Sequence, residues 1–257
     1  MSAFSIIIRL FSLPYAAKLG CVCVHPVLVA ALAVGAAGPV SAQPLEEIVV
    51  TASLRDATLA RFPASTTVLD AGVLGAGGVQ HLQDVLGLVP NLNWAGGSSR
   101  PRYFQLRGIG ELEQYQGSPN PSVGFLIDGI DFSGVGMPAT SFDVEQVEVL
   151  RGPQGTRYGA NALAGLINVR TRDAAPEDEL ATEVTAGEDG LVGAAFVAGG
   201  GFGESAGGAW RLAAQRTRSD GFRRNVYLGR EDTNDRDELT LRGKLALEPA
   251  DGWNVHL

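Results

Sequence analysis

The chain has 257 residues, of which 34 are glycine, nearly twice the usual share of roughly 7%. A glycine-rich chain with 45% hydrophobic and 19% charged residues is neither a helix bundle nor wholly disordered. Acidic residues outnumber basic ones by 28 to 20, which argues against a dominant nucleic-acid-binding role because such domains carry a basic face.

Residues 1–42 have the order of a secretory signal peptide. They contain Arg9 and Lys18 but no acidic residue, continue in an apolar run over 19–34, and end in small residues at Ala42. A positive start, an apolar centre and a small-residue site predict cleavage after Ala42. A transmembrane anchor is the alternative, but a run broken by proline and glycine fits removal better.

Both cysteines of the chain, Cys21 and Cys23, lie inside this segment. Its removal would leave residues 43–257 without cysteine. We therefore expect an exported protein that has no disulfide and no thiolate site.

A short β-branched tract, residues 44–52, follows close to the new N-terminus. A strand in a tail with nothing nearby to pair with is a candidate for strand addition to a partner protein. The alternative is an ordinary edge strand of the next domain, and the tract by itself favours neither.

Residues 63–173 have the pattern of a compact α+β domain. Apolar residues at helical spacing from Val79 to Val89 predict an amphipathic helix that Pro90 ends, with His81 on the helix surface. Short strands bounded by Gly, Pro or Asp are predicted at 66–69, 103–107, 123–127, 144–150 and 166–171.

Beyond Pro176 the pattern becomes one of long alternating strands. Apolar and polar residues alternate over 210–215 and again over 239–248. About 9–11 residues cross a bilayer as a tilted strand, whereas strands of soluble sandwiches have about 5–6. The long alternation therefore favours a membrane barrel. The predicted strands are 180–187, 191–201, 208–218 and 237–248.

The connections support this pattern, but the number of strands falls short of a barrel. Connections 188–190 and 249–252 are short, whereas 219–236 is long and highly charged. Only four strands and the start of a fifth at 253–257 are present. A barrel needs at least about eight, because an open edge in lipid leaves backbone groups unpaired. We therefore expect a fragment of a larger protein or a truncated product.

One passage is far more specific: residues 142–171 read FDVEQVEVLRGPQGTRYGANALAGLINVRT. This run resembles the signature that closes the plug domain of the TonB-dependent outer-membrane receptors. Gln105–Gly110 is similar to the family's "IRG" strand end, Leu126–Ile130 to its "DG" strand, and Glu46–Ala52 to its TonB box. The four motifs occur in family order over residues 46–173.

The resemblance implies an α+β plug domain followed by the N-terminal strands of an antiparallel transmembrane β-barrel, here incomplete. In the family, a ligand binds from outside, and TonB pulls the TonB box from the periplasm to drive import through the outer membrane. The resemblance implies a transporter without enzymatic activity or a cofactor. Its commonest ligand is a ferric siderophore, while cobalamin, haem, nickel chelates and carbohydrates stay open. The implied divisions are signal peptide 1–42, TonB box and linker 43–62, plug domain 63–175 and barrel start 176–257.

The resemblance also assigns roles to individual residues. It places a plug–barrel lock at Arg107 and Arg151, which would pair with carboxylates of the barrel wall. A bidentate, always-charged guanidinium suits such a lock because a buried pair is costly to break from one side. Ala164-Gly165 stands where the family commonly has two glycines. The TonB-binding residues are Glu47, Ile48, Val49, Val50, Thr51 and Ala52. The structural motif residues are Gly108, Asp128, Gly129, Gly152, Pro153, Gly155, Tyr158, Gly159 and Asn168.

Other interpretations compete with transport. A stand-alone periplasmic plug-like module could bind a ligand or TonB, but the amphipathic strands would then expose an apolar face to water. Gly203–Gly207 matches the nucleophile elbow of esterases, with Ser205 as the nucleophile, although a hairpin turn also explains the glycines. Within the transporter hypothesis, loops 94–100 and 111–121 are expected to form part of the ligand floor.

Overall fold

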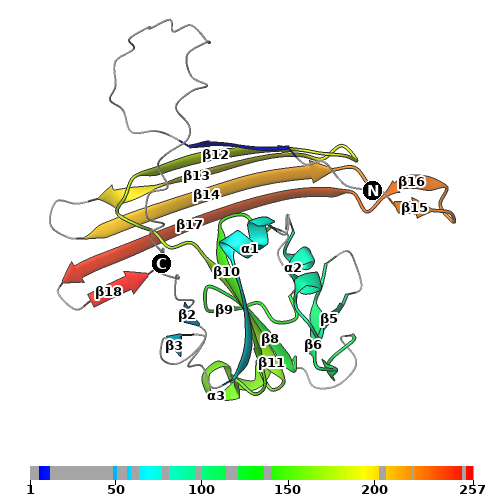
Figure 1. The fold of residues 1–257 in the computed structure, drawn as a ribbon, viewed down its shortest axis with the longest axis horizontal. Coiled ribbons are helices and arrows are strands. Elements are labelled where there is room, and N and C mark those ends of the chain that lie inside the picture. Colours follow the sequence, from blue (N-terminus) through cyan, green and yellow to red (C-terminus); the bar gives the residue numbers. More distant parts are fainter. Residues whose placement is uncertain are drawn as a thin grey trace, which may run out of the picture.

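The computed structural model describes residues 6–11, 49–50, 57–58, 64–76, 81–96, 100–113, 121–135, 140–202, 207–221, 223–250 and 253–256. It has two parts: a compact α+β domain and a long, twisted sheet that lies against one side of it (Figure 1). No helix in the described ranges is long and apolar enough to cross a membrane.

The α+β domain is built on a five-stranded sheet in the order β4-β10-β11-β8-β9. The central strand β10 pairs antiparallel with β4 on one side and with β11 on the other, and β11 pairs parallel with β8. Strand β11 is almost entirely buried, and β10 buries its apolar residues together with Glu148, while Glu145 of β10 is exposed. The strands are β4 (Ser65–Asp70), β8 (Val123–Ile127), β9 (Ile130–Asp131), β10 (Val144–Arg151) and β11 (Gly165–Thr171).

Three short helices, a 3-10 turn and a small sheet complete this domain. Helix α1 (Ala71–Ala76) follows β4 directly, and α2 (Leu82–Leu88) buries Leu82, Val85 and Leu86. The helix predicted before Pro90 is thus confirmed over Leu82–Leu88, while residues 77–80 lie outside the described ranges. The remaining elements are β5 (Leu92–Ala95), β6 (Tyr103–Leu106), β7 (Ile109–Gly110), α3 (Gly155–Tyr158) and the 3-10 turn η2 (Gly159–Asn161).

The prediction that His81 lies on the helix surface is wrong. Its side chain is buried, with only 4% of the residue exposed, because it is the N-cap of α2 and faces the long sheet. Nδ1 of His81 accepts a hydrogen bond from the Gln83 amide at 2.9 Å, and the His81 amide donates to the Asp84 carboxylate at 3.2 Å. A helical period alone cannot show that another sheet covers the first turn of the helix.

The long sheet is an antiparallel meander in chain order, and we call its strands β12, β13, β14, β17 and β18 the wall sheet. Three of its strands, β13, β14 and β17, have 11, 12 and 15 residues and are much longer than is usual in soluble sandwiches, as the alternating pattern predicted. The strands are β12 (Glu179–Ala186), β13 (Val192–Phe202), β14 (Gly208–Ser219), β17 (Arg236–Ala250) and β18 (Trp253–His256).

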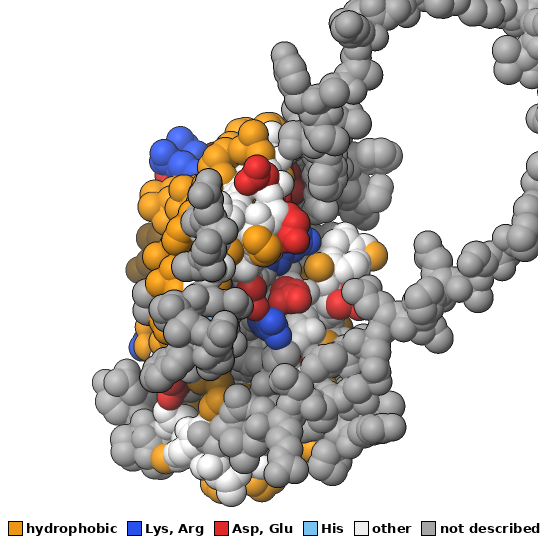
Figure 2. Space-filling view, turned by 90° about the vertical axis from the view of Figure 1, so that its left-hand side faces the viewer, with side chains coloured by type: hydrophobic (Ala, Val, Ile, Leu, Met, Phe, Trp, Pro, Cys, Tyr) orange, Lys and Arg blue, Asp and Glu red, His pale blue; other side chains and the backbone are white. Residues whose placement is uncertain are grey.

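Alternation along these strands separates an apolar face from a polar one. Leu239, Leu241 and Leu245 of β17 are 42–66% exposed on the face away from the α+β domain. Figure 2 shows hydrophobic side chains stacked along one side of the molecule and acidic and basic side chains gathered beside them. An exposed apolar face of this extent marks a surface that contacts lipid or another apolar partner. The other exposed apolar residues of this face are Leu180, Val184, Val192, Phe196, Phe202, Trp210 and Leu212.

In outer-membrane barrels, short turns lie at one end and long loops at the other, but the connections of the wall sheet are not sorted in this way. The short connection 188–190 lies at the same end as the long connection 219–236, since the Asp220 amide donates to the Asp189 carbonyl at 2.7 Å. Each strand reverses direction, so successive connections fall at alternate ends. The long connection contains its own hairpin, β15 (Arg223–Asn225) with β16 (Arg230–Thr233).

Two further pairings involve the N-terminal segments. Strand β1 (Ile6–Phe11) pairs antiparallel with the outer edge of β12, although these residues lie within the expected signal peptide. Strand β2 (Val49–Val50) pairs antiparallel with β3 (Ala57–Thr58) in a sheet of its own. Residues 203–206, which include Ser205, lie outside the described ranges. The element that follows them is strand β14, whereas a nucleophile elbow leads into a helix.

Candidate functional site between the α+β domain and the wall sheet

The polar face of the wall sheet meets the α+β domain through basic side chains. Arg211 of β14 lies between two carboxylates, with side-chain exposures of 5% for Arg211 and 4% for Asp143. Its Nη2 and Nε donate to the two oxygens of Asp143 at 2.6 and 3.1 Å, and its Nη1 donates to Glu179 of β12 at 2.7 Å. A bidentate pair this deeply buried stabilises one relative position of its two elements, and removing one partner costs about 3–5 kcal/mol.

Lys244 of β17 makes a second set of contacts. Its Nζ donates to the Thr171 carbonyl at 2.9 Å and lies 3.1 Å from Asp173 and 3.3 Å from Asp128. Asp128 also accepts hydrogen bonds from the amide and hydroxyl of Thr171 at 2.8 and 2.6 Å. Nearby on the same strand, Arg242 donates to the Phe142 carbonyl. Arg211, Arg242 and Lys244 of the wall sheet therefore contact the α+β domain at the start of β10, at the end of β11 and at the turn between β8 and β9.

The backbone holds two of these carboxylates in turns of unusual conformation. Asp128 and Asp143 have φ values of +48° and +59°, in the left-handed region that Asp tolerates better than most residues. Asp128-Gly129 is a two-residue turn in which Ile127 pairs with Ile130 and both turn residues have positive φ, as a type I′ hairpin requires.

Arg107-Gly108 forms the same kind of turn. Leu106 pairs with Ile109 across it, and Arg107 and Gly108 have φ values of +54° and +81°. Among the six non-glycine residues with positive φ in the described chain, Arg107 is the one that is neither Asn nor Asp. An arginine in this conformation costs about 1 kcal/mol, and such strain is commonly retained at functional positions.

Arg151 lies at the end of β10 and fastens its neighbours within the α+β domain. It donates to the Thr67 hydroxyl of β4 at 2.9 Å and to the Pro90 carbonyl at 3.1 Å. Partial burial lowers the pKa of the Arg151 guanidinium, and the nearby charge of Arg107 lowers it further. The structure therefore brings the two expected lock arginines together. Neither takes part in an ion pair among the described residues.

The expected TonB-binding residues are described only in part. Val49 and Val50 form β2, where Val49 pairs with Thr58 and Val50 is completely buried. The other four residues, Glu47, Ile48, Thr51 and Ala52, lie outside the described ranges.

The remaining motif residues shape the loops around β10 and β11. Gly152 and Gly159 have positive φ, Pro153 is exposed, Gly155 begins α3, and Tyr158 packs against the small apolar cluster around Leu150 and Leu166. The buried Asn168 amide donates to buried Glu148 at 3.2 Å. A Cβ at Gly165 would collide with Leu106 and with the Leu150 carbonyl, so the second residue of Ala164-Gly165 must be glycine.

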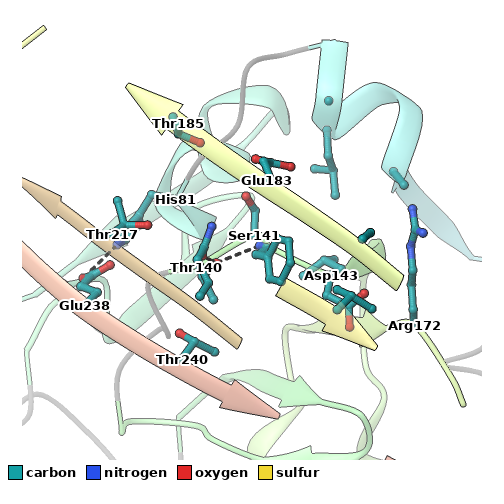
Figure 3. Close-up of a pocket in the computed structure, with 18 of the residues that line it drawn as sticks. His81, Thr140, Ser141, Asp143, Arg172, Glu183, Thr185, Thr217, Glu238 and Thr240 are labelled. Atoms are coloured by element: carbon teal, nitrogen blue, oxygen red, sulfur yellow. Dashed lines mark hydrogen bonds and ion pairs between the residues drawn. The ribbon is translucent and has the colours of Figure 1, made fainter. Parts of the chain in front are cut away.

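A cavity of about 270 Å³ separates α1 and the start of β10 from the wall sheet (Figure 3). Hydroxyl groups of Thr140, Thr185, Thr217 and Thr240 line it, together with the carboxylates of Glu183 and Glu238. Within the described ranges, no group of three or more His, Cys, Asp or Glu residues is placed to hold a metal ion.

Glu238 of the wall sheet connects this cavity to the α+β domain. Its carboxylate lies 3.1 Å from the Arg100 guanidinium and 3.9 Å from Nε2 of His81. Burial lowers the pKa of His81 to about 4, and the positive charges of Arg236 and Arg100 contribute. His81 is therefore neutral near pH 7 and acts as a helix cap. Arg100 ends the loop 94–100, one of the two loops expected to contact ligand.

Sequence reasoning missed Asp143, Arg211 and Lys244 as contact residues. The alternation did place Arg211 and Lys244 on the polar phase of their strands, opposite the outward leucines. A basic residue on the inward phase of a long strand was therefore the available signal.

Comparison with known proteins finds similarity to receptors and transporters. Residues 58–166 match the family described as TonB-dependent Receptor Plug Domain. The Vitamin B12 transporter BtuB of Vibrio vulnificus is 30% identical over 185 residues, which are 69% of this chain and 28% of that protein. The Pesticin receptor of Yersinia pestis is 34% identical over 134 residues, which are 51% of this chain and 20% of that protein.

Solved structures show the same arrangement. The ferric yersiniabactin uptake receptor FyuA from Yersinia pestis has a TM-score of 0.63 and 28% identity, over 73% of this chain and 29% of that one. The pyoverdine outer membrane receptor FpvA from Pseudomonas aeruginosa shares the fold, with a TM-score of 0.65 and 19% identity over 81% of this chain and 29% of that one. The chain spans less than a third of the length of these four proteins. With an α+β plug domain followed by antiparallel strands of the barrel type, the chain belongs to the TonB-dependent receptor family.

Proposed function

We propose that this chain is the N-terminal part of an outer-membrane receptor that imports its ligand with energy delivered by TonB. The observation that carries the proposal is the plug domain docked on the polar face of a sheet whose other face is apolar. A wall with one polar and one apolar face suits a barrel that holds the plug inside and contacts lipid outside. The apolar face argues against the alternative of a stand-alone periplasmic module.

For the ligand we propose a metal chelate, with a ferric siderophore first. The support is the similarity to the ferric yersiniabactin uptake receptor at 28% identity, together with the similarity to the Pesticin receptor. Cobalamin is the competing ligand, because a Vitamin B12 transporter is 30% identical over 69% of this chain. The loops 94–100 and 111–121 would form part of the floor on which the ligand rests, and the Arg100–Glu238 pair would tie the first loop to the wall.

For the partner we propose the periplasmic domain of TonB, bound by strand addition to Glu47–Ala52. The β-branched tract and the strand conformation of Val49–Val50 support this role. We also propose export by a signal peptide cleaved after Ala42. Cleavage there would remove β1 and free the outer edge of β12 for another strand.

For the lock we propose that Arg107 and Arg151 bind carboxylates on barrel strands that follow this chain. Their proximity, the strained φ of Arg107 and the lack of an ion pair for either among the described residues support this role.

The experiment is ligand uptake by cells that lack the gene, compared with complemented cells. Radiolabelled iron would be supplied on a panel of siderophores, and labelled cyanocobalamin would be supplied separately. We expect complementation to restore the uptake of one ferric siderophore, and a tonB deletion to abolish it. If complementation restored the uptake of cyanocobalamin alone, a siderophore would be rejected as the ligand, while the proposed transport function would stand. If cells that lack the gene took up every ligand as well as complemented cells do, import of these ligands would be rejected as its function.

A further inference from the structure

We infer that Asp128, Asp143 and Asp173 form a second attachment of the plug to the barrel wall, opposite in charge to the lock proposed for Arg107 and Arg151. We call these three carboxylates the acidic clasp. In the lock, the plug supplies the cations; in the clasp, the plug supplies the anions and the wall supplies Arg211 and Lys244. The inference goes beyond the proposed function because it concerns how the plug is oriented and retained, which needs no transported ligand.

The contacts of Arg211 are those of a fixed joint. One guanidinium joins the plug at Asp143 with the neighbouring wall strand β12 at Glu179, and all three of its donor nitrogens that face the interface are used. The Arg211 and Asp143 side chains are almost completely excluded from solvent. Salt screens exposed pairs but has little access to such a pair, so the joint persists at physiological ionic strength.

The conformation of the carboxylates supports the same role. Asp128 and Asp143 both adopt positive φ, and the side chains of both contact wall cations. Strain of this kind persists where surrounding contacts over-determine the conformation. Lys244 contacts the Thr171 carbonyl and the carboxylates of Asp128 and Asp173 at once. It therefore links the β8–β9 turn and the end of β11 to strand β17.

The clasp and the lock lie at opposite ends of one strand. Asp143 immediately precedes β10 and Arg151 ends it, eight residues later. Eight residues of strand span roughly 25 Å, so the plug carries an anionic end and a cationic end across most of its width. A plug turned end for end would bring Arg151 toward Arg211 and Lys244, and like charges would oppose that docking. The clasp therefore sets the orientation of the plug in the barrel.

The test is charge exchange in the native outer-membrane protein, read as passive leak. Three variants are compared: Asp143→Arg, Arg211→Asp, and the two together. Leak is measured as single-channel conductance of the purified protein in planar bilayers and as sensitivity of cells to a large antibiotic that the outer membrane normally excludes. We expect each single variant to increase open events at least roughly tenfold, because it leaves a buried charge facing a like charge. We expect the double variant to leak clearly less than either single variant, since the pairing between positions 143 and 211 is restored with its charges reversed, although the pairing of Arg211 with Glu179 is not.

The matched control is another arginine of the same strand. Arg216 pairs with Asp237 at 3.1 Å, but both side chains are more than half exposed, and among the described residues neither forms a hydrogen bond or ion pair with the plug. Arg216→Asp should leave the conductance unchanged. Heat-modifiable migration on gels verifies that the barrel has folded in each variant.

Two results would overturn the inference. Single variants that fold, reach the membrane and stay closed would show that the pair retains nothing, and a double variant as leaky as the singles would show that charge pairing is not the cause. If Arg211→Asp fails to fold, Lys244→Glu with Asp173→Lys replaces it, because Lys244 is less buried. The double variant of Lys244→Glu with Asp173→Lys is expected to leak less than either of its single variants. Equal leak in all three would contradict the clasp.

Discussion

Asp143 and Arg211 meet through two hydrogen bonds of 2.6 and 3.1 Å, although their positions in the chain are 68 residues apart. The pair joins the turn before β10 to the first half of β14, so it connects the signature motif of the plug with the first part of the barrel wall. The plug and the wall sheet are therefore held together by ion pairs in which the wall supplies the cations and the plug supplies the anions.

Replacing Val49 with Pro is expected to abolish uptake while sparing ligand binding. Proline removes the backbone donor of a strand residue and fixes φ, so the TonB-box strand can no longer pair fully with a partner strand. Uptake of labelled ligand and equilibrium binding to intact cells measure the two effects separately. Val49→Ile is the control, since it keeps the donor and the β-branch. Undiminished transport by Val49→Pro would show that this tract is not the TonB box.

Replacing Arg107 with Asn is expected to stabilise the turn and weaken the plug–barrel lock. Asn tolerates positive φ better than Arg, so the plug should gain about 0.5–1 kcal/mol against unfolding by urea. Loss of the guanidinium should nevertheless increase passive conductance. Arg107→Lys keeps a positive charge without the planar fork and should show leak with no gain in stability. A more stable plug with unchanged conductance would reject the lock at this position.

Lowering the pH is expected to destabilise the plug through His81. The pKa of His81 is lowered from 6.5 to about 4 in the folded protein, chiefly by burial. The unfolded chain therefore binds a proton between pH 6.5 and 4 while the folded chain does not. Stability is complete above pH 6.5 and falls by about 2–3 kcal/mol as the pH drops toward 4.

The measurement is urea unfolding of the plug at pH 7.5 and 4.5, with the His81→Asn variant as control. Asn supplies an N-cap acceptor but does not titrate, so the variant should lose much less stability on acidification. An equal loss of stability in parent and variant would show that other groups cause the pH dependence.

Replacing Gly165 with Ala is expected to destabilise the plug by about 1–3 kcal/mol, because the added methyl group overlaps Leu106 and the Leu150 carbonyl. The neighbouring exchange Ala164→Gly should change the free energy of unfolding by less than about 1 kcal/mol, the ordinary effect of backbone entropy. Urea unfolding of the two variants compares them directly. Equal effects at both positions would contradict the packing seen around Gly165.

The sequence predicted those features that depend on local pattern. Helix α2 and the longer strands of both sheets were predicted from apolar spacing. The short strand β9 and the hairpin turns at Arg107-Gly108 and Asp128-Gly129 were not predicted, although the strands before them were expected to be bounded by Gly, Pro or Asp. Contacts between distant segments could not be predicted in the same way. Alternation shows that Arg211 faces the polar side of its strand, but not that it meets Asp143. For the same reason the burial of His81 by the wall sheet was missed.

The most direct test of the account is the location of the native protein in fractionated cell envelopes, detected with an antibody against residues 63–173. If the wall sheet belongs to a transmembrane barrel, the antibody will detect a protein in the outer membrane that migrates differently on gels with and without heating. A soluble periplasmic product of the same mass with and without heating would contradict the barrel and leave a plug-like binding module in its place.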